Sequence, residues 1–535
     1  MLAAVKAPIF HFNEQREDLV HAVVERVVAE AKDPALLLND AAYHELRRLE
    51  SAKGGERDAI GKWRKVARAI GSLDGAGSRD LLREVALEAA RDVAGNFDRR
   101  VYTLAARVAP AGLSLFLSPH VIAEHTPMEL LRGEGLADRI RTTGPVERIR
   151  KLSETGTIVY VPTHLSNLDS PVFAYALESS RLPPVTYGAG KNLFTNPVLS
   201  FFMRNLGAYR VDRRLKHELY KNVLKAYSCV LIERGFHSLF FPGGTRSRSG
   251  GVERKLKLGL AGTGLEAFVR TKMRGAQRRV FFVPATINYM LTLEAETLID
   301  DHLKEAGKAR YIIEDDESTR LGRIAIFIRK LALMEGACAV RFGSPLDPFG
   351  NEVDDDGASH DRRGRPIDAN GYITQLDGDA IVFDPARDAQ YTRELGEVVV
   401  SQYLRDTIAM PTHVVATAAF ARLRALHPSA DLFALVRRSD EAIVPQREMI
   451  AEIESTQQRL VELERRGEIV LAPAVRGATS SELLHDAERA LNGYHTNPVI
   501  RSRDGGVALL DPKLLLYYQN RLAGHGVAWA GGVSR

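Results

Sequence analysis

The chain has 535 residues, of which 45% are hydrophobic and 26% charged, so it is a folded globular protein too long for one ordinary core. It contains only two cysteines, Cys229 and Cys338, which argues against a disulfide scaffold or a cysteine-rich zinc site and favours a reducing, cytosol-facing compartment. A formal net charge of +5 is a mild excess at this length and does not indicate nucleic-acid binding.

The first 147 residues are predicted to form a helical N-terminal domain. Apolar residues recur there at three- and four-residue spacing with charges between them, as in 16–31 (REDLVHAVVERVVAEA). The first residues lack the pattern of a signal peptide, and no run reaches the roughly 20 apolar residues of a membrane-spanning helix. The most apolar stretch, 108–124, is broken by Pro and Ser. It is expected to pack in a core, with docking on a membrane surface as the alternative.

Residues 148–345 are predicted to form an α/β domain, because short β-rich runs alternate there with helical patterns. The expected fold is a central mixed or mostly parallel sheet flanked by helices. In open sheets of this kind, ligands bind beyond the carboxyl ends of the strands. The predicted strands are 157–161, 185–189, 207–211, 237–241, 279–289 and 337–343.

The remaining chain divides into two predicted parts. Residues 346–383 are rich in Asp, Gly and Arg, and they are expected to form a flexible polar insertion. Its acidic run lacks the ordered ligand spacing of a calcium-binding loop, so a solvated loop is the preferred interpretation. Helical periodicity returns after this point, and 384–535 is predicted to be a mostly helical C-terminal region.

The strongest chemical signal is His164, which follows the predicted strand 157–161, together with Asp169 five residues later. The two would not share a helix face, but a strand-to-helix turn could bring them together. A carboxylate that accepts from one imidazole nitrogen fixes the tautomer and leaves the other nitrogen to take a proton. The pair therefore predicts a general base, and an incidental His beside a helix-capping Asp is the alternative.

Two arginine-bearing stretches follow. The strand 207–211 ends in Arg210, Arg213 and Arg214, whose forked guanidinium groups suit phosphate, although pairing with Asp212 is equally consistent. The strand 237–241 runs into a glycine-rich turn at 242–251. Exposed backbone N–H groups, a hydroxyl and two guanidinium groups would make an anion site there. The residues concerned are Gly244, Thr245, Arg246 and Arg248.

The predicted strand 279–289 (RVFFVPATINY) contains Pro284. Proline is confined to the edges or bulges of sheets. Pro284 is therefore expected either to shape a wall where an apolar group enters, or simply to mark an edge strand.

These four stretches, in this order, resemble the four blocks of the glycerolipid acyltransferase family. HLSNLD at 164–169 resembles its His-x4-Asp block, and GAYRVDRR at 207–214 resembles its second. FFPGGTRSRSG at 240–250 and FFVPATINY at 281–289 resemble the third and fourth. The third block departs at Gly243, where the family usually carries Glu. The helical N-terminal part and the C-terminal LLLYYQNRLAGHG are similar to the larger bacterial, membrane-associated glycerol-3-phosphate acyltransferases.

The resemblance implies an enzyme that transfers a fatty acyl group from a thioester of CoA or acyl carrier protein to the sn-1 hydroxyl of glycerol 3-phosphate, the first step of phospholipid synthesis. His164 would be the base and Asp169 would orient it. Pro284 would help to line the acyl side, and Arg210, Arg213, Arg246 and Arg248 would bind the phosphate, with Gly244 and Thr245 shaping the turn.

Several further expectations accompany this function. No metal or bound cofactor is needed, because the thioester is already activated. A peripheral location on the cytoplasmic side of the cell membrane is expected, because the acyl substrate is a lipid, and no nucleic acid is expected as a partner. The alternative acceptors are dihydroxyacetone phosphate and lysophosphatidate. An alternative of another class is a non-catalytic lipid- or anion-binding protein on the same scaffold, which Gly243 keeps open.

Overall fold

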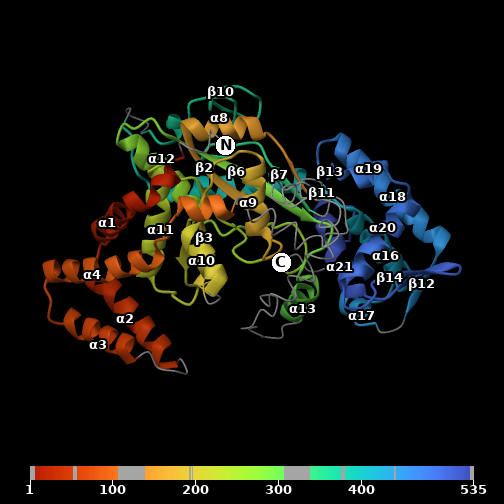
Figure 1. Ribbon diagram of the computed structural model, residues 1–535, viewed down its shortest axis with the longest axis horizontal. Helices are drawn as coiled ribbons and strands as arrows, with labels where there is room; N and C mark the ends of the chain where they lie inside the picture. Colours follow the sequence, from red (N-terminus) through yellow and green to blue (C-terminus); the bar gives the residue numbers. More distant parts are fainter. Residues whose placement is uncertain are drawn as a thin grey trace.

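The computed structural model describes residues 7–51, 57–105, 139–191, 194, 197–306, 338–374, 380–438 and 441–529. A central sheet with helices around it separates a helical N-terminal region from the C-terminal region (Figure 1). This arrangement confirms the predicted fold class, an α/β sheet with a helical N-terminal and a mostly helical C-terminal region.

The central sheet has seven strands in the order β1-β7-β6-β2-β5-β3-β4. All neighbouring strands in it run parallel except β6 and β7, which pair antiparallel. The strands of the sheet are β1 (Ile140–Thr143), β2 (Gly156–Pro162), β3 (Thr186–Gly190), β4 (Ala208–Val211), β5 (Ser238–Leu239), β6 (Arg279–Tyr289) and β7 (Cys338–Phe342).

Strand β2 lies in the interior of this sheet, between β6 and β5. Its residues are all buried, as expected for a parallel strand with helices on both faces. Ile158 and Tyr160 belong to one hydrophobic cluster, whereas Val159 and Val161 belong to another. This alternation anchors the strand from both sides, so the turn that follows it starts from a fixed point.

Helices cover both faces of the sheet. The cluster with Ile158 includes residues of α8 and α9, and the cluster with Val159 includes residues of α11, α12 and α15. The helices that accompany the sheet are α8 (Val146–Thr155), α9 (Asp169–Ser179), α10 (Pro197–Asn205), α11 (Glu218–Glu233), α12 (Ala261–Met273), α13 (Ala295–Ala306) and α15 (Pro385–Arg405).

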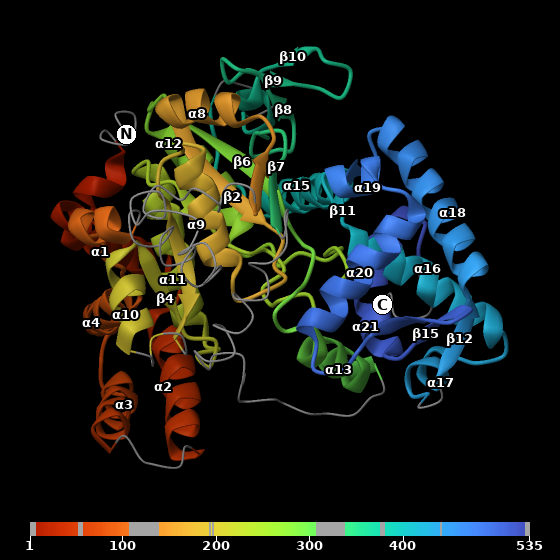
Figure 2. The same cartoon turned by 45° about the vertical axis from the view of Figure 1, so that its right-hand side comes forward.

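The N-terminal region begins with η2 (Pro8–His11) and contains α1 (Phe12–Glu30), α2 (Pro34–Ser51), α3 (Arg57–Ile70) and α4 (Gly75–Val93). Helices α1 and α4 share a hydrophobic cluster with α11, which fastens the region to one side of the sheet. Helices α2 and α3 pack on each other and extend away from the rest of the molecule (Figure 2).

The C-terminal region wraps several helices around a small antiparallel sheet of order β12-β15-β14. Its core is continuous with that of the central sheet. The helical elements are α16 (Pro411–Leu426), α17 (Leu432–Val436), α18 (Gln446–Arg465), α19 (Pro473–Gly477), α20 (Ser480–Tyr494), α21 (Pro512–Gln519) and η6 (Asn520–His525). The strands are β11 (Ile408–Ala409), β12 (Ala442–Pro445), β13 (Val470–Leu471), β14 (Ile500–Arg503) and β15 (Gly506–Leu509).

Two parts of the chain differ from what the sequence pattern predicts. Residues 140–143, expected to be helical, form β1 and pair with β7 from almost 200 residues away. So short a strand has no periodicity of its own, and its pairing partner decides it. Residues 346–383, predicted as a flexible polar insertion, include short elements that the sequence pattern does not indicate: η5 (Ala369–Tyr372) and a three-stranded sheet of β8 (Glu352–Val353), β9 (Ser359–His360) and β10 (Pro366–Ile367).

Candidate active site

His164 and Asp169 meet in the turn between β2 and α9. The Nδ1–H of His164 donates to Oδ2 of Asp169 at 2.7 Å, and a carboxylate can only accept, so the proton is on Nδ1. The side chain of His164 is 17% exposed and that of Asp169 is fully buried. The arrangement leaves Nε2 as the ring nitrogen available to a substrate, which is the geometry of an oriented general base.

Asp169 is held by three further donors. Its Oδ2 accepts from the backbone N–H groups of Leu165 and Ser166 at 2.6 and 2.9 Å, and its Oδ1 accepts from the hydroxyl of Tyr289 at 2.8 Å. Burial and the neighbouring Asp169 raise the pKa of Tyr289, which keeps this donor protonated. A buried carboxylate with this many donors is stabilised as an anion in one orientation.

The backbone of His164 is bound by the segment that carries the third block. Its N–H donates to Oε1 of Glu253 at 2.7 Å, and its carbonyl accepts from the N–H of Ser247 at 2.7 Å. The imidazole ring also stacks on Phe241, with ring centroids 4.3 Å apart. The first and third blocks are therefore one hydrogen-bonded unit.

Glu294, which the sequence reasoning did not single out, links the same two blocks. Its carboxylate accepts from the Ser166 hydroxyl at 2.9 Å and from the Asn167 N–H at 3.0 Å. It also lies 3.0 Å from Nη1 of Arg246. Burial raises the pKa of Glu294, and the charge of Arg246 opposes that shift. Glu294 thus fixes Arg246 beside the turn that carries His164.

Arg213 is exposed and lies close enough to Arg246 for the two charges to interact. Loss of hydration and the nearby positive charge of Arg246 together lower the pKa of Arg213. No ion pair of Arg213 is found in the part of the chain that the structure describes. Two guanidinium groups that repel each other make a site where an anion is stabilising.

Two of the other predicted phosphate ligands are engaged elsewhere. Arg210, on β4, pairs with Asp92 of α4 at 2.8 Å, and Arg248 pairs with Glu305 of α13 at 2.7 Å. The structure therefore brings together His164, Asp169 and Arg246, with Arg213 within electrostatic range of Arg246, while Arg210 and Arg248 form ion pairs with helices around this cluster.

The glycine turn of the third block contains Gly244 in the left-handed backbone region, and the N–H of this residue donates to the Phe241 carbonyl at 3.0 Å. Gly244 has φ +73°, a conformation that suits glycine. A Cβ at this position would lie 2.5 Å from Cδ and 2.9 Å from Nζ of Lys257, so the Lys257 side chain covers the turn. Thr245 is exposed beside it. Lys257 is a further cation at the turn, and the sequence analysis does not single it out. Nothing in its local pattern indicates that its side chain folds back onto Gly244.

Pro284 is buried in β6, in the interior of the sheet, which corrects the edge-strand alternative. Its carbonyl accepts from the N–H of Gly343 at 2.8 Å. The pairing of β6 shifts by one residue there, between the Ala285–Phe342 pair and the Phe282–Leu346 bridge. Pro284 thus lies at a bulge, where its missing N–H is tolerated, and its role on the acyl side stays a prediction.

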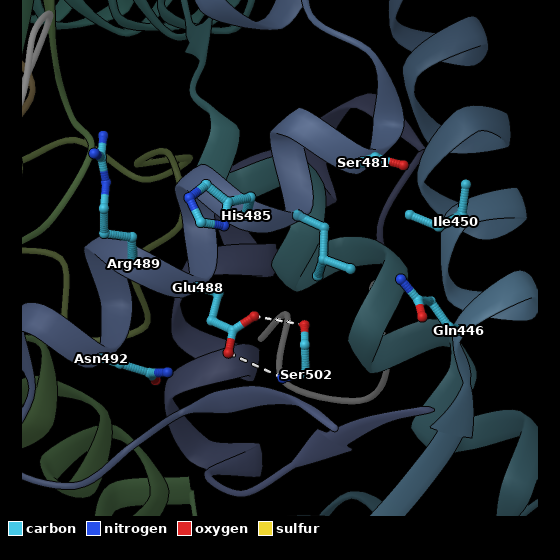
Figure 3. Close-up of a pocket in the computed structure, with 9 residues that line it drawn as sticks. Gln446, Ile450, Ser481, His485, Glu488, Arg489, Asn492 and Ser502 are labelled. Carbon is cyan, nitrogen blue, oxygen red and sulfur yellow. Dashed lines mark hydrogen bonds between the residues drawn. The ribbon is translucent and has the colours of Figure 1, made fainter. Parts of the chain in front are cut away.

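A hollow of about 510 Å³ lies in the C-terminal region, away from His164, among α18, α20 and β14 (Figure 3). Several polar side chains that line the hollow form hydrogen bonds with neighbouring residues of the same region. Glu488 accepts from both the N–H and the hydroxyl of Ser502, and Asn492 donates to the carbonyl of Ile500. Among the described residues no cluster of His, Cys, Asp and Glu could hold a metal ion.

Comparison with known proteins gives consistent matches. Residues 144–288 match the family model named Acyltransferase, which spans the first three blocks and nearly all of the fourth. Glycerol-3-phosphate acyltransferases of Pseudomonas paraeruginosa and Pseudomonas fluorescens are 31% and 30% identical over 209 and 281 residues. These alignments cover 39% and 52% of this chain, but only 22% and 30% of the relatives.

A third relative, the glycerol-3-phosphate acyltransferase of Actinobacillus pleuropneumoniae, is 33% identical over 202 residues, 37% of this chain and 23% of its own length. Among solved structures, the 1-acyl-sn-glycerophosphate acyltransferase of Thermotoga maritima aligns with 46% of this chain and 81% of its own. Its TM-score of 0.24 and 16% identity are too low to support a conclusion. Residues 144–288 are therefore an acyltransferase region similar to that of glycerol-3-phosphate acyltransferases, and the chain spans less than a third of the length of the curated relatives that it matches.

Proposed function

We propose that the protein transfers a fatty acyl group from a thioester to the sn-1 hydroxyl of glycerol 3-phosphate. The observation that carries the proposal is the 2.7 Å bond from His164 Nδ1 to the buried Asp169, close to Arg246, which Glu294 holds beside the same turn. A proton acceptor beside a cationic site is what acyl transfer to a phosphate-bearing alcohol requires.

In this mechanism Nε2 of His164 takes the proton of the acceptor hydroxyl while its oxygen attacks the thioester carbonyl. The tetrahedral intermediate then collapses, the C–S bond breaks, and the leaving thiolate receives the proton from His164. Asp169 stabilises the imidazolium that forms between these steps. A well-placed base of this kind contributes about 10²- to 10⁴-fold to the rate.

The acceptor phosphate would bind to Arg213 and Arg246, with Gly244, Thr245 and Lys257 at the turn. Arg210 and Arg248 could bind the phosphate only by breaking their ion pairs with Asp92 and Glu305. We therefore propose them as secondary phosphate ligands. Charge pairing to a phosphate gives a small acceptor the orientation that its own surface cannot provide.

The names of the curated relatives favour glycerol 3-phosphate over the alternative acceptors, dihydroxyacetone phosphate and lysophosphatidate. The non-catalytic alternative is disfavoured because the base and its carboxylate are hydrogen-bonded to each other and built into the core. CoA and acyl carrier protein both remain proposed donors of the acyl group.

We also propose peripheral attachment to the cytoplasmic face of the membrane, because the acyl group and the product are lipids. In the part of the chain that the structure describes, no helix is both long and apolar enough to cross a bilayer. The stretch 108–124, for which docking on a membrane surface is the alternative to packing in a core, lies outside the described residues.

The deciding experiment is a thiol-release assay on the purified chain with palmitoyl-CoA, followed by palmitoyl carrier protein, and each of the three acceptors in turn. Turnover with glycerol 3-phosphate, lost in His164→Ala, would support the proposal. Preference for another acceptor would reassign the substrate, and no turnover with either donor would favour the non-catalytic alternative.

A further inference from the structure

The space next to Gly243 is occupied by the side chain of Glu253. A Cβ built on Gly243 would lie 3.2 Å from both Cγ and Oε1 of Glu253, and 3.4 Å from the Thr245 carbonyl oxygen. Gly243 is the one position at which the third block departs from the resembling pattern, by lacking a carboxylate. A carboxylate is nevertheless present there, supplied from ten residues further along the chain.

The Glu253 carboxylate acts directly on the candidate base. Its Oε1 accepts the backbone N–H of His164 at 2.7 Å, a short charge-assisted bond. That N–H comes directly after the buried β2 strand, at the point where the chain turns toward Asp169. Glu253 therefore helps to fix the position of the His164 backbone. This position in turn helps to orient the imidazole ring toward Asp169.

This carboxylate is placed at a cost in stability. Its Oε2 is buried and has no hydrogen-bond partner among the described residues. Burial raises the pKa of Glu253, and the His164 N–H and the charge of Arg521 oppose that shift. Leaving one oxygen of a buried acid without a donor is unfavourable, so bonding of the His164 N–H alone does not account for an acid at this position.

The compensating charge comes from the C-terminal region. Arg521, in η6, is only 2% exposed. Its Nη2 donates to the Ile287 carbonyl at 3.0 Å and to Oδ1 of Asn288 at 2.8 Å. Its Nε and Nη1 have no hydrogen-bond partner within the described ranges. The charges of Arg521 and Glu253 attract each other, which opposes but does not reverse the effect of burial: the pKa of Glu253 stays raised and that of Arg521 stays lowered.

We propose that Glu253 is a positioning residue that replaces the carboxylate absent at Gly243 and holds the backbone of His164 in its working place. This inference rests on the proposed function and deepens it. It concerns the same site but a residue that lies outside the four blocks.

The test is a carboxylate swap assayed with palmitoyl-CoA or palmitoyl carrier protein and glycerol 3-phosphate. Glu253→Ala is expected to lower kcat about 10- to 100-fold, the effect of losing one charge-assisted hydrogen bond at the base. Gly243→Glu alone is expected to lose activity too, because its side chain meets Glu253. The double variant Gly243→Glu/Glu253→Ala is expected to recover to within several-fold of the unaltered chain.

Gly243→Ala/Glu253→Ala is the matched control, since it adds a side chain at 243 without a carboxylate. Full activity of Glu253→Ala, or recovery in this control equal to that in the swap, would overturn the inference. Melting temperatures of all variants distinguish a loss of folding from a displaced His164 in a folded protein. Glu253→Gln can still accept a hydrogen bond from the His164 N–H, so it is expected to retain an intermediate kcat.

An activity-independent readout separates this inference from the proposed function. The rate at which diethyl pyrocarbonate modifies His164, followed by peptide mass spectrometry, is expected to rise several-fold in Glu253→Ala and to return in the swap. An inactive chain that shows this pattern would overturn the acyl-transfer proposal and support the positioning role. An unchanged modification rate in Glu253→Ala would overturn the positioning role.

Discussion

Glu294 and Arg246 form an ion pair of 3.0 Å, and the same carboxylate binds the turn after His164 through Ser166 and Asn167. One buried acid therefore sets the distance between the base and the predicted phosphate site. It lies directly before α13, in the segment that follows β6, and so belongs to neither of the loops that it joins.

Removing this link is expected to harm both binding and chemistry. Glu294→Ala should raise the KM for glycerol 3-phosphate and lower kcat, each by about 10-fold or more, because Arg246 and the His164 turn lose a shared charged partner. Steady-state kinetics measure both effects. Glu305→Gln, which breaks the exposed pair with Arg248, is the control and should change either constant less than threefold. Equal effects of the two variants would contradict this role of Glu294.

The base itself is tested by His164→Ala and Asp169→Asn. Each should lower kcat by about 10²- to 10⁴-fold. Asp169→Asn should also destabilise the fold, because this carboxylate accepts from His164, Leu165, Ser166 and Tyr289. Circular dichroism and thermal melting would show whether each variant is folded. A folded His164→Ala with the full rate would be incompatible with the mechanism.

Arg213 is an exposed cation and one of the two arginines proposed first as ligands of the acceptor phosphate. Arg213→Ala should raise the KM for glycerol 3-phosphate about 10- to 100-fold with a smaller change in kcat, since a charged hydrogen bond to the bound acceptor is lost. The matched control is Arg214→Ala, whose guanidinium bonds to Asp212 at 2.7 and 3.0 Å. A larger KM effect in the control than in Arg213→Ala would place the phosphate elsewhere.

The contact between the third block and the C-terminal region can be tested with two glycines. Gly250 has φ +81°, and a Cβ there would lie 2.3 Å from the carbonyl oxygen of Tyr517 in α21. Gly275 has φ +70° with nothing within 4 Å of such a Cβ. Both Ala variants suffer backbone strain of about 1 kcal/mol, but Gly250→Ala should also separate the loop from α21.

The expected difference in unfolding free energy between these two variants is about 2 kcal/mol or more, from the strain and clash together. Urea unfolding measures it, and the assay with glycerol 3-phosphate should show an activity loss in Gly250→Ala alone. Indistinguishable variants would mean that the loop and α21 move independently.

A pH dependence is expected at the junction of α13 with the C-terminal region. The close approach of His495, whose Nδ1 lies 3.3 Å from Oε1 of Glu296, and hydrogen bonds from the N–H and hydroxyl of Thr496 lower the pKa of Glu296 to about 2 from its ordinary 4.5. Because the folded value lies below the unfolded one, the stabilisation is complete above pH 4.5 and is lost as the pH falls toward 2.

Glu296→Gln should therefore lower the unfolding free energy at pH 7 by about 1 kcal/mol, after allowance for solvent screening of a side chain that is 46% exposed. Urea unfolding of both proteins at several pH values measures the difference, which should shrink steadily below pH 4.5. A difference independent of pH down to 3 would rule out this linkage.

Much of the fold can be predicted from the sequence. The apolar run at 157–161 becomes β2, and the strand–helix alternation becomes the central sheet, because periodicity is a local property that survives whatever the chain later packs against. The pairing of His164 with Asp169 is also local, since five residues at a strand-to-helix turn suffice to form it. Strand β1 escapes prediction because its partner β7 lies far away in sequence.

The surroundings of the site are decided by tertiary structure. No local pattern distinguishes Arg213 from Arg210, which pairs with Asp92 more than 100 residues away. Nor does any pattern indicate that Glu253 and Glu294 converge on the turn after β2 from 89 and 127 residues further along. The sequence by itself determines which groups can do chemistry. The folded chain determines which of those charges are neutralised, because the partner of an ion pair is chosen by proximity in space and by burial.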